Sequence, residues 1–148
     1  MHALSNALCK LMKTKITLIL SLFFSHSIYA EEKLDCENPL STTAMNICAN
    51  QAVELENDSL DKYLAKAREK YSDSPEIVEA LNNSQESWLV YRKSYCNAIS
   101  VQWSGGTIQG VMFSSCMLKL TKRRIHNIWA DYLTYMDSTP PMLPKPKL

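Results

Sequence analysis

The stretch LNNSQESWLVYRKSYC, residues 81–96, decides the fold class. Its apolar and long side chains recur at steps of three or four residues, which is the repeat of one face of an α-helix. With Ile99, that face comprises Leu81, Gln85, Trp88, Arg92 and Cys96. Ser74 and Pro75 suit the N-cap and the first helical residue. The pattern predicts a helix from Pro75 to about Ser100.

Similar patterns lie on both sides of this helix. Upstream, a run free of Gly and Pro follows the possible N-caps Ser41 and Thr42 and extends to about Tyr71. Downstream, Trp103-Ser104-Gly105-Gly106 is a clear break, and a third pattern reaches from about Thr107 to Tyr135. The third stripe repeats every fourth residue: Met112, Cys116, Leu120, Arg124 and Ile128. Three helices with short connections predict an all-α fold, a small up-down-up three-helix bundle.

The first thirty residues have the features of a secretory signal peptide. They contain three lysines, no acidic residue and the apolar run 16–24, which is shorter than the ~20 residues that span a bilayer as a helix. We expect Sec-type export, cleavage after Ala30 and a periplasmic or secreted product; a retained membrane anchor is the alternative. Met12 begins a more typical signal than Met1. The expected domains are 1–30 (signal), 31–136 (helical) and 137–148, a flexible tail with four prolines in 138–148.

Removal of 1–30 leaves 13 basic and 15 acidic residues, a formal charge of −2. Nucleic-acid binding, which favours a basic face, is therefore not expected. No second long apolar segment follows, so no membrane span is expected after cleavage.

An even set of cysteines remains after export: Cys36, Cys48, Cys96 and Cys116. In an oxidising compartment this predicts two disulfides, for which three pairings are possible. A bundle whose first two helices form a hairpin would set residue 48 roughly opposite 97, which favours Cys48–Cys96 and Cys36–Cys116. A metal site is not expected, because there is no CxxC pair and His126 is the only histidine of the exported part.

Two arginines lie on apolar stripes, Arg92 beside Trp88 and Arg124 on the third helix. A buried arginine needs a carboxylate partner or a path to water, and Asp58 or Asp61 on the first helix could be that partner. A structural ion pair under Trp88 is therefore the first interpretation. An anion- or partner-binding arginine is the alternative.

The residues contain no catalytic constellation, so we expect no enzyme and no cofactor. Gly105-Gly106 lacks the other residues of a phosphate loop, and His126 has no evident nucleophile beside it. Trp103, next to the two glycines, either contacts a partner or folds over the end of the bundle.

These motifs together resemble the LprI-like lysozyme inhibitor family of bacterial envelope proteins. The matching features run over residues 36–128: Cys36, Thr43-x-x-x-Asn-x-Cys48, Leu60-Asp61, Gln85-x-x-Trp88-Leu-x-Tyr91-Arg92-x-x-x-Cys96, Gly105-Gly106-Thr107 and Cys116-x-x-x-Leu120-Thr121-x-x-Arg124. The chain departs from the family on the first helix. It has Asn57, Leu60-Asp61 and Leu64 where the family usually shows an Asp, a Leu-Asn pair and a Tyr.

The resemblance implies a helical, disulfide-bonded, non-enzymatic domain, and a protein that binds a muramidase and so protects the cell wall. An immunity or adaptor protein for another envelope-acting toxin or complex is the alternative. A lysozyme cleft carries two carboxyl groups, so an inhibitor would present hydrogen-bond donors on a rigid protrusion. We expect that protrusion in the loop 101–109, with Gln102, Trp103, Ser104 and Thr107 as contacts.

Overall fold

The structure, a computed structural model, describes residues 34–148. In this part of the chain the helices are α2 (Thr42–Lys70), α3 (Pro75–Gln102) and α4 (Gln109–Ile128), which continues into the π-helical turn η1 (Trp129–Leu133). The predicted all-α three-helix fold is confirmed. The predicted signal peptide and the start at Met12 lie outside the described residues. Within residues 34–148, no helix is both long and apolar enough to cross a membrane.

The helix boundaries largely follow the sequence signals. The Ser41 hydroxyl accepts a hydrogen bond from the amide of Ala44 at 3.1 Å, and Pro75 is the first residue of α3. The start of the third helix differs slightly from the prediction: the helix begins at Gln109, with Ile108 as its N-cap, and not at about Thr107. A turn over residues 106–109, in which the Gln109 amide donates to the Gly106 carbonyl, delays the first helical residue.

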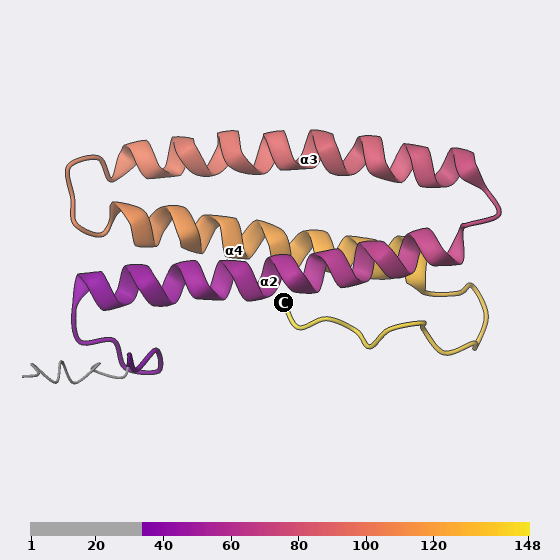
Figure 1. The fold of residues 1–148 in the computed structure, drawn as a ribbon, viewed down its shortest axis with the longest axis horizontal. Coiled ribbons are helices and arrows are strands. Elements are labelled where there is room, and N and C mark those ends of the chain that lie inside the picture. The colour runs from indigo at the N-terminus through magenta and orange to yellow at the C-terminus, as the bar shows by residue number, and fades with distance from the viewer. Residues whose placement is uncertain (1–33) are drawn as a thin grey trace, which may run out of the picture. The chain divides into compact units, whose positions relative to one another are not determined.

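Helix α4 is the central element of the bundle. It packs along both α2 and α3, whereas the backbones of α2 and α3 have almost no direct contact. At the end where α3 turns into α4, α4 lies between the other two helices (Figure 1). The up-down-up order is therefore preserved, but the first two helices do not form a packed hairpin.

The hydrophobic core occupies the end of the bundle where α2 turns into α3. It consists of Leu60, Tyr63, Leu64, Ala67, Leu81, Ile125, Ile128 and Leu133. Both disulfides lie toward the opposite end, where α2 begins and α3 turns into α4. Apolar burial thus stabilises one end, and covalent bonds brace the other.

The disulfide pairing corrects the prediction: the bonds are Cys36–Cys48 and Cys96–Cys116, with Cα–Cα distances of 5.4 and 5.5 Å. Cys96 and Cys116 are each ten residues from Gly106, so the α3–α4 hairpin places them opposite one another. Cys48 cannot meet Cys96 in this way, because α4 separates α2 from α3 at that end. The predicted pairing assumed the α2–α3 hairpin that the structure lacks.

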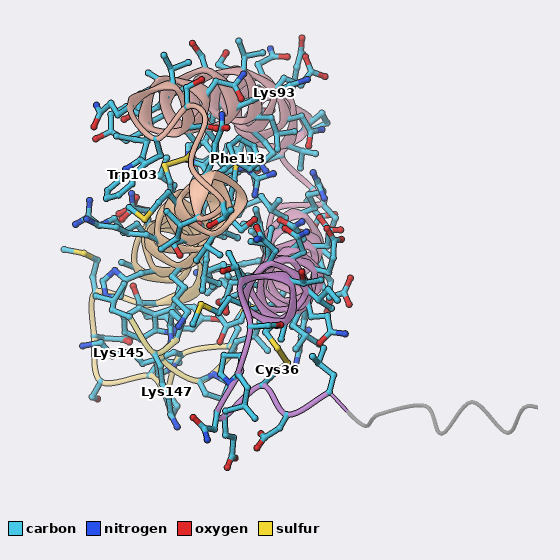
Figure 2. All side chains as sticks on the ribbon, turned by 90° about the vertical axis from the view of Figure 1, so that its left-hand side faces the viewer. Cys36, Lys93, Trp103, Phe113, Lys145 and Lys147 are labelled. Atoms are coloured by element: carbon cyan, nitrogen blue, oxygen red, sulfur yellow. A yellow bond between two sulfur atoms is a disulfide. The ribbon has the colours of Figure 1, made fainter. Side chains whose placement is uncertain are left out.

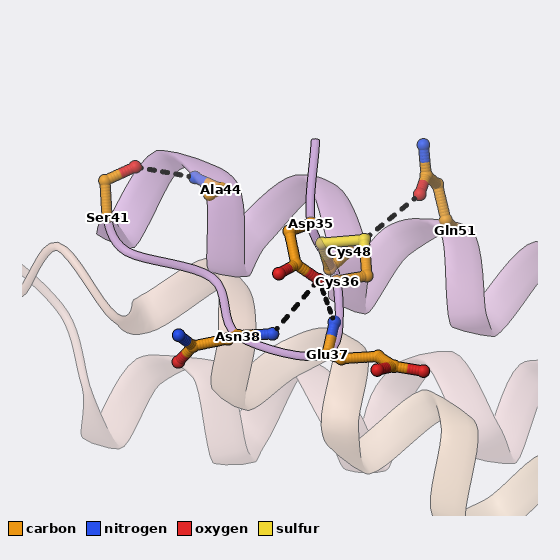
Figure 3. The surroundings of a disulfide bond; sticks show 8 residues. All are labelled: Asp35, Cys36, Glu37, Asn38, Ser41, Ala44, Cys48 and Gln51. Atoms are coloured by element: carbon orange, nitrogen blue, oxygen red, sulfur yellow. Dashed lines mark hydrogen bonds between the residues drawn. A yellow bond between two sulfur atoms is a disulfide. The ribbon is translucent and has the colours of Figure 1, made fainter. Parts of the chain in front are cut away.

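The Cys36–Cys48 disulfide joins the segment before α2 to the second turn of that helix (Figure 3). The Asp35 carboxylate accepts from the amides of Glu37 at 2.9 Å and Asn38 at 3.4 Å, which bends the chain beside the bond. This disulfide therefore fixes the approach to α2.

The proline-rich segment 137–148 has no helix or strand, but it contacts the bundle. The Tyr63 hydroxyl donates to the Pro144 carbonyl at 2.7 Å, and the Trp129 indole N–H donates to the Leu143 carbonyl at 2.9 Å. Met142 and Leu143 pack against the core. The sequence predicted a flexible tail here, without these contacts.

Candidate functional site

The face of α3 that decided the fold class carries a buried arginine at its centre. The Arg92 side chain is only 8% exposed. Its Nη1 donates to the Asn57 side-chain oxygen at 2.8 Å and to the Thr121 hydroxyl at 2.7 Å. Since Asn57 lies on α2 and Thr121 on α4, one guanidinium connects all three helices.

Trp88 packs between this arginine and Arg124. The Arg92 guanidinium carbon lies 4.7 Å from the centre of the indole ring, and that of Arg124 lies 5.8 Å from it. Both distances are in the range of cation–π attraction. Arg124 also donates to the Gln85 side chain at 3.0 Å and to the Ser84 hydroxyl at 2.9 Å. The structure thus brings together Gln85, Trp88, Arg92 and Arg124, which we call the arginine–tryptophan cluster.

Tyr91, the fifth motif residue, is not part of this cluster. It lies on the outer side of α3, 52% exposed, with its ring 5.7 Å from that of Tyr95. Its position one residue before Arg92 turns it by about 100° around the helix, away from the buried face.

The expected ion pair between an arginine of the cluster and Asp58 or Asp61 is absent. Arg92 is bound by the amide of Asn57, one helical turn before Asp61, and the only ion pair among residues 34–148 joins Lys66 and Glu69. Burial lowers the pKa of Arg92, and the charge of Glu54 partly offsets that shift. The neutral side-chain amide of Asn57 therefore takes the place of the carboxylate that was expected to bind Arg92.

The contacts of the cluster hold the three helices together. The Arg92 Nε atom is buried without a hydrogen-bond partner, so the charge is incompletely solvated by the protein. The adjoining groove, of about 550 Å³, is lined by Asp61 and Glu86 as well as Arg68 and Arg92. Its mixed charges do not select an anion, which favours the structural interpretation of the arginines.

Asn57 and Thr121 were not predicted as partners of Arg92. Thr121 directly follows Leu120, a residue of the apolar stripe of the third helix. A hydroxyl next to an apolar stripe was the one sequence signal that could have suggested a partner for a buried arginine. Asn57 was visible only as a departure from the family pattern. Predicting its role required knowing that α2 and α4 both lie beside Arg92 of α3.

The second group of predicted residues lies on the exposed connection between α3 and α4. Gln102 ends α3 and Trp103 is its C-cap, while every residue from Val101 to Ile108 is exposed. Gly105 has φ +81°, a left-handed conformation that residues with a side chain adopt only at a cost. The loop therefore has a turn geometry that depends on glycine.

The loop is held from both sides. The Asn46 side chain of α2 donates to the Thr107 carbonyl at 3.4 Å, and the Gln109 side chain donates to the Ser100 hydroxyl at 3.2 Å. The Cys96–Cys116 disulfide ties the two helices that enter and leave it. Figure 2 looks onto this end and shows Trp103 at its surface, where the side chain is 42% exposed. Gln102, Trp103, Ser104 and Thr107 thus share one braced turn.

No group of three or more His, Cys, Asp or Glu side chains that could hold a metal occurs within residues 34–148. All four cysteines of this part are in disulfides, so none can act as a thiolate nucleophile. Disulfides of this kind are typical of proteins outside the cytoplasm.

Comparisons with known proteins agree with the motif pattern. The chain is 27% identical over 101 residues to an uncharacterized protein of Rhizobium meliloti (strain 1021), a match covering 61% of this chain and 73% of that protein. No solved structure is significantly similar. The sequence profile described as "Lysozyme inhibitor LprI" matches residues 36–128, from Cys36 to Ile128, the last residue of α4. The chain belongs to the LprI lysozyme inhibitor family.

Proposed function

We propose that this protein is an exported, non-enzymatic inhibitor that binds a lysozyme-type muramidase and thereby protects the cell wall. Family membership supports the class of function. Two disulfides support a location outside the cytoplasm, and the expected signal sequence agrees with the periplasm or the exterior. The observation that carries the proposal is the exposed, doubly braced loop with Trp103 on it.

The loop has the physical features of an inhibitory protrusion. A rigid loop loses little conformational entropy on binding, so more of its contact energy appears as affinity. Trp103 provides a large amphipathic side chain of the kind that dominates protein interfaces. Gln102, Ser104 and Thr107 supply amide and hydroxyl donors beside it. Such donors are complementary to a cleft that carries carboxyl groups.

The test compares variants in a muramidase assay on bacterial wall substrate. Trp103→Ala is expected to weaken inhibition by ~30-fold, the size of a typical interface hot spot. Val90→Ala is the control, because Val90 is a 72% exposed apolar residue in the middle of α3, and it is expected to leave inhibition unchanged.

The assay separates the position of the contact from the inhibitory function itself. Unchanged inhibition by Trp103→Ala would refute the placement of the contact on the loop. Absence of inhibition by the unaltered, oxidised protein would refute the function itself.

A further inference from the structure

A groove between α3 and α4 is lined neither by the arginine–tryptophan cluster nor by the loop residues of the proposed inhibition. Tyr91, Tyr95 and Ile99 of α3 form one wall; the other consists of residues of α4, namely Met112, Ser115, Cys116, Lys119, Leu120 and Arg123. Its volume is about 290 Å³, and we call it the tyrosine groove. The two tyrosine rings lie side by side, 5.7 Å apart and tilted by 33°, and each is about half exposed.

The tyrosine groove is cationic. Lys119 and Arg123 lie one helical turn apart on α4, and neither forms an ion pair within residues 34–148. The sequence from Ser87 to Ala130 contains six Lys and Arg residues and no Asp or Glu. A groove lined by apolar, aromatic and basic side chains is suited to an apolar side chain flanked by carboxylates.

The first half of α2 presents such a surface. Leu55 is 72% and Ile47 43% exposed, and they line a shallow depression together with Asn50, Gln51, Glu54 and Asp58. We call this surface the acidic face. Residues 34–61 contain six carboxylates and no Lys, Arg or His. Both acidic side chains of the depression are exposed and free of ion pairs within the described part.

The two surfaces match in spacing as well as charge. Glu54 and Asp58 are four residues apart on one helix, as are Lys119 and Arg123 on another, which corresponds to ~6 Å along each axis. Leu55 lies next to the acidic pair, as Leu120 lies next to the basic pair. The acidic face is formed by α2 alone and the groove by α3 and α4 alone, so the two are separate surfaces of one molecule.

We propose that the acidic face of one copy of this protein docks into the tyrosine groove of a second copy. Residues 34–148 carry 12 basic and 13 acidic side chains, so net repulsion between copies is small while the charges are segregated. The contact is heterologous: it forms a closed dimer if two copies can satisfy it reciprocally and a larger assembly if they cannot. Its modest size places it among weak, reversible interfaces.

Sedimentation velocity of the purified, oxidised protein tests this directly. Association is expected at tens to hundreds of micromolar protein near 0.02 M ionic strength, weakening at least ~10-fold at 0.5 M as charge interactions are screened. Lys119→Glu/Arg123→Glu is expected to abolish it, and so is Glu54→Lys/Asp58→Lys. Lys93→Glu/Lys147→Glu is the matched control, because both lysines are exposed and neither lines the groove (Figure 2).

The decisive arm mixes the two charge-reversed variants. Each alone repels its own copies, but in an equimolar mixture every groove meets a face of opposite charge, so association is expected to return. Circular dichroism confirms that the variants are folded. A wild-type protein that stays monomeric at low salt, variants that still associate, or a mixture that stays monomeric would each overturn the proposal. So would a groove that binds an acidic peptide while the protein remains monomeric.

Discussion

Replacing Asn57 by aspartate should stabilise this protein, although it buries an additional charge. Arg92 is already desolvated, and its Nη1 lies 2.8 Å from the Asn57 oxygen. The substitution changes only the charge of the acceptor, so a neutral partner becomes a carboxylate in a geometry that is already formed. Charge-assisted hydrogen bonds are about twice as strong as neutral ones.

The net gain is smaller than the Coulomb term. At an effective dielectric constant of about 20, two charges 4 Å apart attract by ~4 kcal/mol. Desolvation of the half-buried carboxylate offsets much of this, which leaves a gain of about 1–2 kcal/mol in the free energy of unfolding. For a domain of this size we expect the Tm to rise by about 5 °C.

Urea denaturation of Asn57→Asp at pH 7 measures the gain in the free energy of unfolding. A double-mutant cycle with Arg92→Gln shows whether that gain comes from the interaction with Arg92. In the Arg92→Gln background the gain should disappear. The new carboxylate should have a pKa below the usual ~3.9 because Arg92 favours its charged form. Its contribution is then present above pH ~4 and is lost as the pH falls through the folded-state pKa. A variant at pH 7 that is no more stable than the wild type would refute this account of Arg92.

Three further predictions concern the rest of the fold. Cys96→Ser/Cys116→Ser should lower the free energy of unfolding by about 3 kcal/mol in urea denaturation, and a loss under 1 kcal/mol would show that this bond does not brace its end. Gly110→Ala should lower the free energy of unfolding by about 1–3 kcal/mol, because the new Cβ meets the Asn46 side chain, which must then release the Thr107 carbonyl. An unchanged Tm would contradict that close approach. Burial, and secondarily Glu56, raises the pKa of Tyr63, so the stability it contributes is present below pH ~10 and lost above it. The difference in unfolding free energy between wild type and Tyr63→Phe, measured from pH 8 to 11, should therefore shrink at high pH, and a constant difference would argue against it.

The helices were predictable because each carries its own local signals. The 3.6-residue repeat of residues 81–96, the Ser41 cap and the Pro75 start depend only on neighbouring residues. The loop was predictable for the same reason, since Gly105-Gly106 interrupts a helical pattern. Local signals therefore identified the helices and the loop, but they left open whether Trp103 is exposed or folds over the end of the bundle; the structure shows it 42% exposed.

The packing between helices was not predictable in this way. Whether Cys96 lies opposite Cys48 or Cys116 depends on whether α3 packs on α2 or on α4, and a stripe of apolar residues does not specify its partner. For the same reason, the sequence predicted an ion pair of an arginine with Asp58 or Asp61, whereas Asn57 is the residue that contacts Arg92. The tail contacts at Leu143 and Pro144 use backbone carbonyls, which no side-chain pattern reveals.

The central claim, that this protein inhibits a muramidase through its disulfide-braced end, is tested by one titration. Purified, oxidised protein is added to c-, g- and i-type lysozymes, and lysis of bacterial wall substrate is followed with and without prior reduction of the inhibitor. We predict saturable inhibition of at least one type by the oxidised protein, with a loss of at least ~10-fold in potency after reduction. No inhibition of any type at micromolar protein would contradict the claim.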